Sequence, residues 1–234
     1  MAVELDGTIQ SSAVTDSTQT YSWSHTIAAN SNRLLVVVCS ARDGTNGNIS
    51  SISATWNTTE NLTLNAGTSG SNSSRASHLL YLINPTATTA NVEVTWSGAA
   101  DTSRCHSYSL YNVHQTLPIA DANSDVEEFP ASAGTAITVG SMTSVPSGSY
   151  MIGIVGTNAG GGTFSAGGSE TIDLQFSALG TGSPISQAVF RQAGVSGTVQ
   201  PAITWTSSQN FSDVAASFQP VASAGSVRRR QVIS

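Results

Sequence analysis

The sequence predicts an all-β protein, folded as an antiparallel β-sandwich of jelly-roll type. Roughly a dozen short segments alternate apolar and polar side chains, as Val92, Val94 and Trp96 do within residues 91–97. Turn residues separate these segments every ~8 to 12 positions. No segment shows a sustained helical period with capping residues. Strands with one buried face and one polar face account for all three observations.

The strand pattern occurs twice along the chain. Three pairs of segments match at nearly the same offset: 34–38 with 150–154, 77–81 with 186–190, and 94–97 with 203–206. This repetition predicts two pseudo-repeated halves, residues 1–113 and 114–220. One sandwich domain over residues 1–220 is favoured, because no Pro-rich or charged linker separates Val113 from Leu117. The alternative is two tandem immunoglobulin-like domains. Residues 221–234 form an Arg-containing C-terminal arm.

The individual strands follow from apolar alternation and from the turn residues between them. In the first half they are expected at 3–10, 20–28, 33–41, 52–56, 62–64, 76–83, 91–97 and 104–113. In the second half they are expected at 136–139, 149–156, 171–176, 187–191, 202–206 and 213–218. The segment 33–41 is apolar almost throughout, which is typical of a central strand covered on both faces. Polar stretches at 66–75 and 98–102 are expected to be loops.

Charge is scarce and unevenly distributed. Charged residues make up 9% of the chain, against ~25% in an ordinary globular domain. All eight basic residues are arginines, and three of them are Arg228, Arg229 and Arg230. Residues 1–227 therefore carry five arginines against 14 acidic residues, a net charge of −9. An acidic body argues against a nucleic-acid partner, and the composition favours an extracellular or virion β-protein over a cytosolic enzyme.

The sequence also predicts where the protein is made. No apolar run approaches the ~20 residues of a membrane span, so no membrane partner is expected. The first ten residues lack the basic and apolar regions of a signal peptide. We therefore expect synthesis in a host cytoplasm, with release by lysis or within an assembly.

Two cysteines, Cys39 and Cys105, each lie in an expected strand. Two interpretations stay open, because spacing alone does not fix the distance between their Cα atoms. They are either two buried thiols, which is the common state of an apolar cysteine, or a disulfide between neighbouring strands.

Motifs for catalysis are missing from the sequence. Without lysine there is no Walker A loop, Schiff base or Ser-Lys dyad, and no G-x-S-x-G, H-E-x-x-H or C-x-x-C pattern occurs. His78 and His106 lie in strands that could pair, so a two-histidine metal site is conceivable. Solvent-facing or hydrogen-bonded histidines are the favoured interpretation. We expect no catalytic residue, metal or cofactor, and no enzymatic activity.

Two groups of residues are candidates for binding a partner. Asp121, Asp125, Glu127 and Glu128 form the densest carboxylate cluster, in a segment expected to be a solvated loop flanked by prolines. Among the tryptophans, Trp96 and Trp205 alternate with apolar neighbours and are expected in the core. Trp56 stands beside a polar turn, and an exposed indole there would stack against a sugar ring.

Four segments carry a resemblance to a known domain: Ser31–Val38, Tyr111–Ala120, Ala202–Thr206 and Asp213–Pro220. They resemble the "NRLLVV" strand, the "GVxQxxPI" turn and the closing "W…AxxxxF.P" strand of a β-sandwich domain found in tailed-phage virion and bacterial surface proteins. Asn112 replaces the usual Gly, and Phe211 replaces a Trp. The resemblance covers nearly the whole chain to Pro220. It implies a fold and a virion or surface context, and it transfers no catalytic residue.

These observations together lead to a hypothesis about function. We expect a capsid decoration or cement protein of a tailed phage, bound to the major capsid protein and to neighbouring copies of itself. Arg228, Arg229 and Arg230 would pair with carboxylates of the shell protein, or with Asp121–Glu128 of an adjacent copy, since guanidinium groups bind carboxylates bidentately. The alternatives are a tail or fibre component, and a carbohydrate-binding module or adhesin that uses Trp56.

Overall fold

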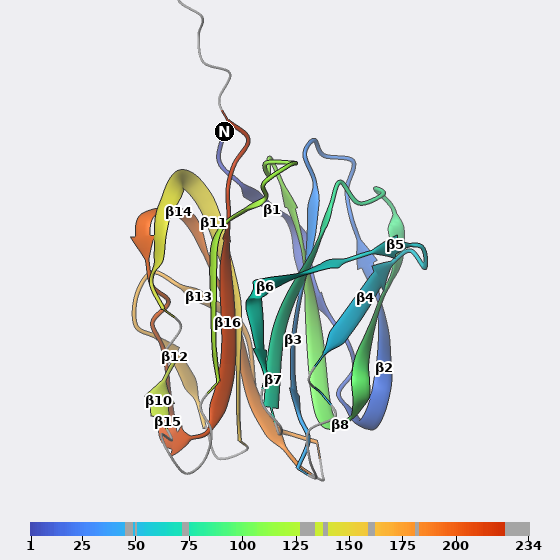
Figure 1. Cartoon of the computed structure of the whole chain (residues 1–234), viewed down its shortest axis with the longest axis vertical. Helices are drawn as coiled ribbons and strands as arrows, with labels where there is room; N and C mark the ends of the chain where they lie inside the picture. The colour runs from blue at the N-terminus through green and yellow to red at the C-terminus, as the bar shows by residue number, and fades with distance from the viewer. Residues whose placement is uncertain are drawn as a thin grey trace, which may run out of the picture.

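Antiparallel strands stacked in layers make up the described part of the chain (Figure 1). A computed structural model describes residues 1–44, 49, 51–71, 75–126, 134–137, 140–158, 162–180 and 183–222. These residues contain sixteen strands and no helix. The prediction of an all-β, antiparallel sandwich is confirmed.

The strands divide between the two halves of the chain. The first half contains β1 (Glu4–Ser11), β2 (Thr15–Thr26), β3 (Leu34–Arg42), β4 (Ile52–Trp56), β5 (Glu60–Asn61), β6 (Thr63–Ser71), β7 (Arg75–Ile83) and β8 (Thr89–Tyr111). The second half contains β9 (Ile119–Val126), β10 (Gly134–Ala136), β11 (Met142–Asn158), β12 (Phe164–Ala166), β13 (Thr171–Leu179), β14 (Ile185–Val199), β15 (Ile203–Gln209) and β16 (Phe211–Phe218).

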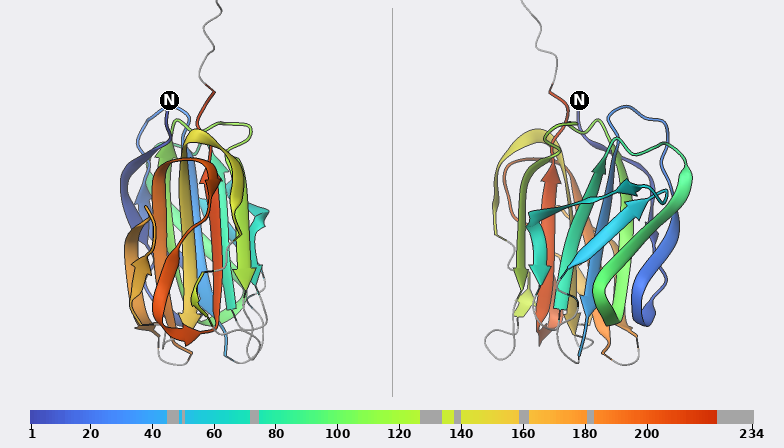
Figure 2. Two further views of the ribbon diagram at one scale, coloured as in Figure 1. Left: turned by 90° about the vertical axis from the view of Figure 1, so that its left-hand side faces the viewer. Right: turned by 45° about the vertical axis from the view of Figure 1, so that its right-hand side comes forward.

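Four layers of strands follow one another across the molecule (Figures 1 and 2). The outer layer of the first half holds β2, β4, β5 and residues 89–100 of β8. The next layer holds β1, β3, β6, β7 and residues 102–111 of β8. The third layer has the order β13-β14-β11-β16-β9, and the outermost layer of the second half has the order β10-β15-β12.

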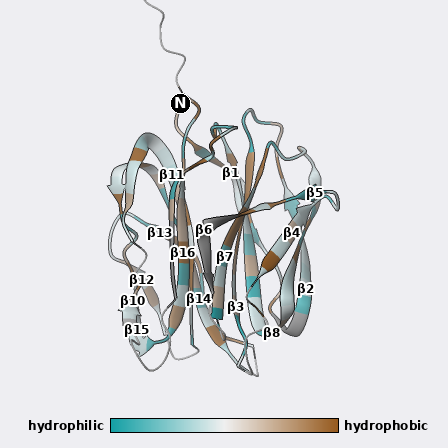
Figure 3. Ribbon diagram, viewed as in Figure 1, coloured by the Kyte–Doolittle hydropathy of each residue, from teal (hydrophilic) through white to brown (hydrophobic). Residues whose placement is uncertain are grey.

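Three apolar clusters fill the spaces between these layers. The first contains Trp23, Trp56 and Trp96 and separates the two layers of the first half. The second lies between the two central layers, and the third lies between the two layers of the second half. Apolar positions, brown in Figure 3, are interspersed with polar ones along the strands. Alternation of this kind gives each strand an apolar face to bury.

Strand β3 confirms the prediction of a central strand covered on both faces. Leu35, Val37 and Cys39 point into the first cluster, whereas the intervening Leu34, Val36 and Val38 point into the second. All of its residues from Leu34 to Ala41 are buried. Because successive side chains alternate between faces, a strand between two cores must be apolar at every position.

The two halves of the chain have a similar strand order. In the first half β3 lies between β7 and β8, and in the second half β11 lies between β14 and β16. The long strand β8 corresponds to β15 and β16, which are separated at Asn210. Trp96 and Trp205 are both buried in the outer cluster of their own half, as the alternation predicted.

Three segments expected to be loops are strands, and those predictions were wrong. Residues 98–102 lie inside β8: between the pairs Thr20↔Thr95 and Thr18↔Ala100, β8 advances by five residues while β2 advances by two. This bulge bends β8 from one layer to the next without breaking it.

Most of 66–75 belongs to β6, paired with β7. Asp121–Val126 belongs to β9, paired with β16. Pairing with a neighbouring strand overrides weak β-propensity.

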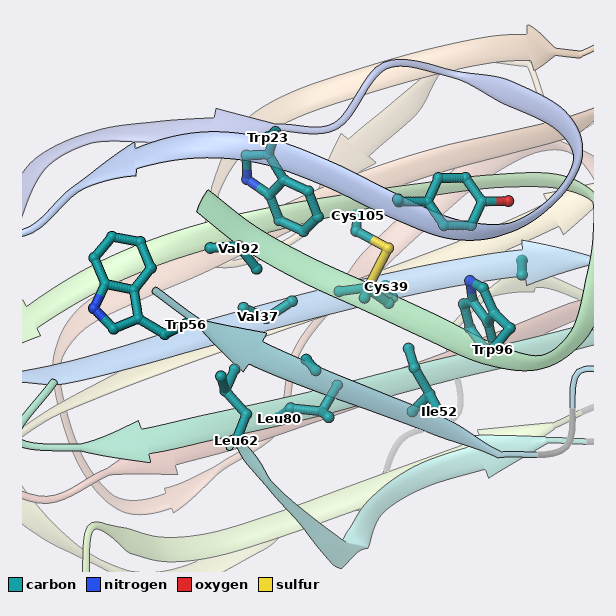
Figure 4. Packing of buried hydrophobic residues seen from close by; sticks show 14 of the residues in the cluster. Trp23, Val37, Cys39, Ile52, Trp56, Leu62, Leu80, Val92, Trp96 and Cys105 are labelled. Atoms are coloured by element: carbon teal, nitrogen blue, oxygen red, sulfur yellow. A yellow bond between two sulfur atoms is a disulfide. The ribbon is translucent and has the colours of Figure 1, made fainter. Parts of the chain in front are cut away.

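The structure decides between the two states left open for the cysteines. Cys39 of β3 and Cys105 of β8 stand directly opposite each other in the antiparallel ladder, and they form a disulfide. Figure 4 shows the sulfur–sulfur bond within the first apolar cluster, with Trp23, Trp56 and Trp96 around it. Both residues are fully buried.

Candidate functional site

The acidic residues proposed for partner binding are only partly within the described chain. Both carboxylate oxygens of Asp121 accept backbone hydrogen bonds, one from Ala122 N–H at 2.8 Å and one from Thr143 N–H at 2.7 Å. Asp121 thus ties β9 to the start of β11. The backbone of Asp125 pairs with Asp213 of β16. Glu127, Glu128, Arg228, Arg229 and Arg230 lie outside the described residues, so their pairing with a partner stays a prediction.

Trp56 is not exposed, and that expectation was wrong. Its side chain is fully buried in the first apolar cluster, and its indole N–H donates to the carbonyl oxygen of Thr86 at 3.2 Å. Figure 4 shows the ring packed among core residues. The polar turn beside Trp56 indicated exposure, but alternation along β4 places Ile52, Ala54 and Trp56 on the same inward face. A sugar therefore cannot stack on this indole.

The two-histidine metal site is also ruled out by the geometry. His78 of β7 pairs with Cys39 of β3, and its ring packs against Trp96. His106 of β8 lies on the opposite face of the sheet, where its ring contacts Gln187 of β14. Both rings are buried, so neither faces solvent. Within the described chain, no group of three or more His, Cys, Asp or Glu residues is arranged to hold a metal ion. The same residues include no helix long and apolar enough to cross a membrane.

A hydrogen-bonded chain runs through Ser11, His106 and Gln187, and its geometry resembles a nucleophile with its base and an orienting group. Ser11 Oγ lies 2.8 Å from His106 Nδ1, and His106 Nε2 lies 2.8 Å from Gln187 Oε1. Since the amide oxygen only accepts, Nε2 carries the proton and Nδ1 accepts from the serine hydroxyl. Burial lowers the pKa of His106 to about 4. A fully buried ring with that pKa is a poor general base. We therefore assign this series of hydrogen bonds the structural role of joining β1, β8 and β14.

A second polar network connects the two halves. Arg191 forms an ion pair with Asp173 at 2.7 Å and donates to the hydroxyl of Tyr150 at 2.8 Å. From the first half, the hydroxyl of Tyr108 donates to the other oxygen of Asp173 at 3.1 Å. Burial, reinforced by Asp173, raises the pKa of Tyr108 well above its usual value. These groups are held neutral or paired, which suits a structural tie between layers.

The exposed apolar side chains lie at one end of the molecule. Of the described residues, Met1 is 74% exposed and Leu117 is 65% exposed, and they are the large hydrophobic residues that face solvent. Both line a groove of about 430 Å³ together with His114, Pro146, Ser147 and residues 219–222. We call these residues the terminal pole. The N-terminus lies at this end (Figures 1 and 2), and Ala222 lines the same groove.

Backbone hydrogen bonds fix the terminal pole. Val3 N–H donates to the carbonyl oxygen of Gly148 at 2.9 Å, and Val221 N–H donates to that of Asn112 at 2.9 Å. Nδ1 of His114 accepts from Leu117 N–H at 3.1 Å, which holds the turn that presents Leu117 to solvent. Sequence reasoning missed this site. The available signal was a leucine within a polar turn, immediately before Pro118.

Comparison with known proteins adds little to these observations. No family model matches the chain. No curated protein matches it. A solved structure from Red Clover Necrotic Mosaic Virus aligns with 94% of this chain and 99% of its own, at 14% identity and a TM-score of 0.24. A TM-score this low carries no argument about fold or function. The β-sandwich implied by the resemblance to phage and surface domains is present. A role in a virion is taken up below as a proposal.

Proposed function

We propose that this chain is a virion structural protein, a capsid decoration protein of a tailed phage that docks on the major capsid lattice through the terminal pole. The observation that carries the proposal is the convergence of Met1, Leu117 and residue 222 around one groove. Exposed apolar side chains that gather on one face are typical of a surface that contacts another macromolecule. Elsewhere among the described residues, no other large hydrophobic side chain is exposed.

The interior supports a mechanical role without enzymatic activity. Its buried polar side chains are largely used in hydrogen bonds between strands, such as Trp23 to Ser107 at 2.9 Å and Ser77 to Ser212 at 2.8 Å. The disulfide between Cys39 and Cys105 is of a kind that persists on virions and in other oxidising surroundings. A rigid body of this type is suited to reinforcing a shell.

The C-terminal arm is proposed to act beside the pole. Arg228 follows Ala222 by six positions, so a fully extended chain would carry its Cα atom at most about 20 Å from the groove. The three arginines would therefore reach the same partner surface as Leu117. Carboxylates on the shell protein, or those of residues 121–128 of an adjacent copy, are the proposed partners of this arm, because guanidinium groups bind carboxylates bidentately.

Two variants test the proposal on shells of the encoding phage that have been stripped of the protein. Leu117→Glu puts a charge at the centre of the contact. Since burying a leucine contributes about 1.5–3 kcal/mol, the affinity should fall at least about tenfold. Deletion of 223–234 should weaken binding further and reduce its dependence on salt. Copies per shell are counted after co-sedimentation.

The matched control is Ser24→Glu, which adds the same charge at an exposed position of β2 that does not line the groove. It should bind as the unchanged protein does. If Leu117→Glu occupied the shells as fully as the unchanged protein, the terminal pole would not be the docking surface. If the labelled protein bound to tails or fibres and left the shells bare, the protein would be a tail or fibre component and not a decoration protein.

A further inference from the structure

The turn between β8 and β9 carries Leu117, the exposed leucine of the terminal pole. This turn lies at the end of the molecule where the N-terminus lies (Figure 1). Leu117 lines the groove of the pole together with His114. Under the proposed function Leu117 makes the docking contact, so a group that holds the turn in shape also controls docking.

One atom of His114 holds this turn. Its Nδ1 accepts from the backbone N–H of Leu117 at 3.1 Å and from that of Thr116 at 3.3 Å. The hydroxyl of Thr116 lies 3.2 Å from the same nitrogen. Asn and Asp form turns in the same way, because their side-chain oxygen accepts from backbone N–H groups a few positions further along the chain. Here an imidazole nitrogen takes the place of that oxygen.

These hydrogen bonds require an unprotonated Nδ1. A backbone N–H only donates, so the proton of the neutral ring is on Nε2. When the ring takes up a second proton, both of its nitrogens become donors. The N–H of a charged His114 would then be directed at two backbone N–H groups, which is repulsive. The ring has to rotate away, and Leu117 N–H loses its acceptor.

The amide side chains that also hold the turn do not titrate. Gln115 Nε2 donates to the carbonyl oxygen of Val113 at 2.8 Å, and Gln219 Nε2 donates to that of Leu117. These bonds keep the turn attached to the body at any pH. The bonds to His114 are therefore the ones that respond to acid.

Few charged groups surround His114. Among the described residues that line the groove, the amino group of Met1 is the one other titratable group. In the strands that flank the turn, the first acidic residues are Glu4 and Asp121, whose carboxylates accept hydrogen bonds from β8 and β11. Arg33, before β3, donates to backbone carbonyl oxygens. Histidines and amino groups are the classes that change charge near neutral pH, so a test must separate His114 from Met1.

We propose that protonation of His114 releases the turn that presents Leu117, so that the terminal pole docks at neutral pH and dissociates more readily as the pH falls. The inference rests on the proposed function and adds the regulation of the same site. His114 is a positioning residue in this scheme, because it acts through Leu117. The bonds at stake are ordinary hydrogen bonds, so the effect on docking should be about threefold to tenfold.

Two variants test the proposal. His114→Asn places an amide oxygen where Nδ1 lies, and this oxygen can accept from the same N–H groups but does not titrate. His114→Ala has no acceptor there. The readout is the ratio of affinities for stripped shells at pH ~7.5 and pH ~5.5, from copies counted after co-sedimentation. This ratio should be about threefold to tenfold larger for the unchanged protein than for either variant. The amino group of Met1 is common to all three proteins and does not affect the comparison.

The turn is followed separately in the free protein, through the hydrogen exchange of Leu117 N–H relative to its intrinsic rate at each pH. Protection should decrease with falling pH in the unchanged protein, persist in His114→Asn and be absent in His114→Ala at both pH values. At pH ~7.5 His114→Asn should also bind shells more tightly than His114→Ala.

The inference is overturned if His114→Asn shows the same ratio of affinities as the unchanged protein, or if docking strengthens in acid. Protection of Leu117 N–H that does not change with pH would also overturn it. If the unchanged protein does not dock at either pH, the proposed function fails and the control of docking fails with it. The exchange data then still decide whether His114 controls the turn.

Discussion

Three histidines in the sheets are buried and neutral. Burial lowers the pKa of His25, His78 and His106 to about 4, against a usual value of 6.5. Two of them use both ring nitrogens inside the protein: His25 contacts the hydroxyls of Ser107 and Ser109, and His106 joins Ser11 to Gln187. His25 and His106 therefore act as hydrogen-bonding members of the core.

This state makes stability depend on pH. Above pH ~6.5 both the folded and the unfolded chain hold neutral imidazoles, so the free energy of unfolding is at its full value. As pH falls from ~6.5 to ~4, the unfolded chain binds protons that the folded chain cannot. We expect a loss of roughly 3 kcal/mol per histidine by about pH 4, measured from urea midpoints across that range.

A variant separates this effect from the titration of carboxylates. His106→Gln can still accept from Ser11 and donate to Gln187, but it does not titrate. Its stability should fall less between pH ~7 and pH ~4 than that of the unchanged protein. An identical pH dependence in the two proteins would show that His106 is not held neutral by burial.

At the scale of the elements, β8 connects the layers of the first half. Its first part pairs with β2 and β4 in the outer layer, and its last part pairs with β1 and β3 in the next layer. The disulfide joins this second part to β3. The second half makes the same change of layer with two strands, β15 and β16, and has no disulfide there.

The disulfide should contribute strongly to stability. It closes a loop between residues 66 positions apart, for which the loss of chain entropy in the unfolded state amounts to about 4 kcal/mol. The double variant Cys39→Ala, Cys105→Ala should therefore unfold at a clearly lower denaturant concentration. Reducing the unchanged protein should lower its midpoint by a similar amount. Thiol titration in denaturant should find no free thiol, and two free thiols would contradict the bond.

Strands could be predicted from the sequence where their pattern depends on neighbouring residues alone. A continuous apolar run identified β3, and alternation identified β7 and the two tryptophan strands, because both patterns are properties of neighbouring residues. They did not identify β6, β9 or the middle of β8, which are polar or rich in small residues. These segments are strands because a partner strand receives their backbone hydrogen bonds. That partner is distant in sequence.

For the whole molecule, the central apolar cluster decides whether the halves behave as one unit. Val36, Val38 and Leu79 of the first half pack with Ile152 and Ile154 of the second. The contact between Tyr108 and Asp173 crosses the same boundary. A buried layer shared in this way couples the halves energetically, since neither could expose it without loss of apolar burial.

We therefore predict a single unfolding transition. In Trp205→Phe, fluorescence reports only on Trp23, Trp56 and Trp96 in the first half, while far-UV circular dichroism reports on all strands. The two denaturation curves should coincide. Adding Ile154→Ala in the second half should lower the first-half midpoint, since the substitution costs about 2–5 kcal/mol. Separate transitions would support two tandem domains.

The sequence by itself determined the fold class, the apolar central strand and the burial of Trp96 and Trp205, since these depend on which residues alternate along a short stretch. The tertiary structure alone decided that Cys39 faces Cys105, that Trp56 is covered, and that Met1 meets Leu117 at one pole. Each of these depends on which distant strands are neighbours, and pairing and layer order are set by the burial of the whole chain.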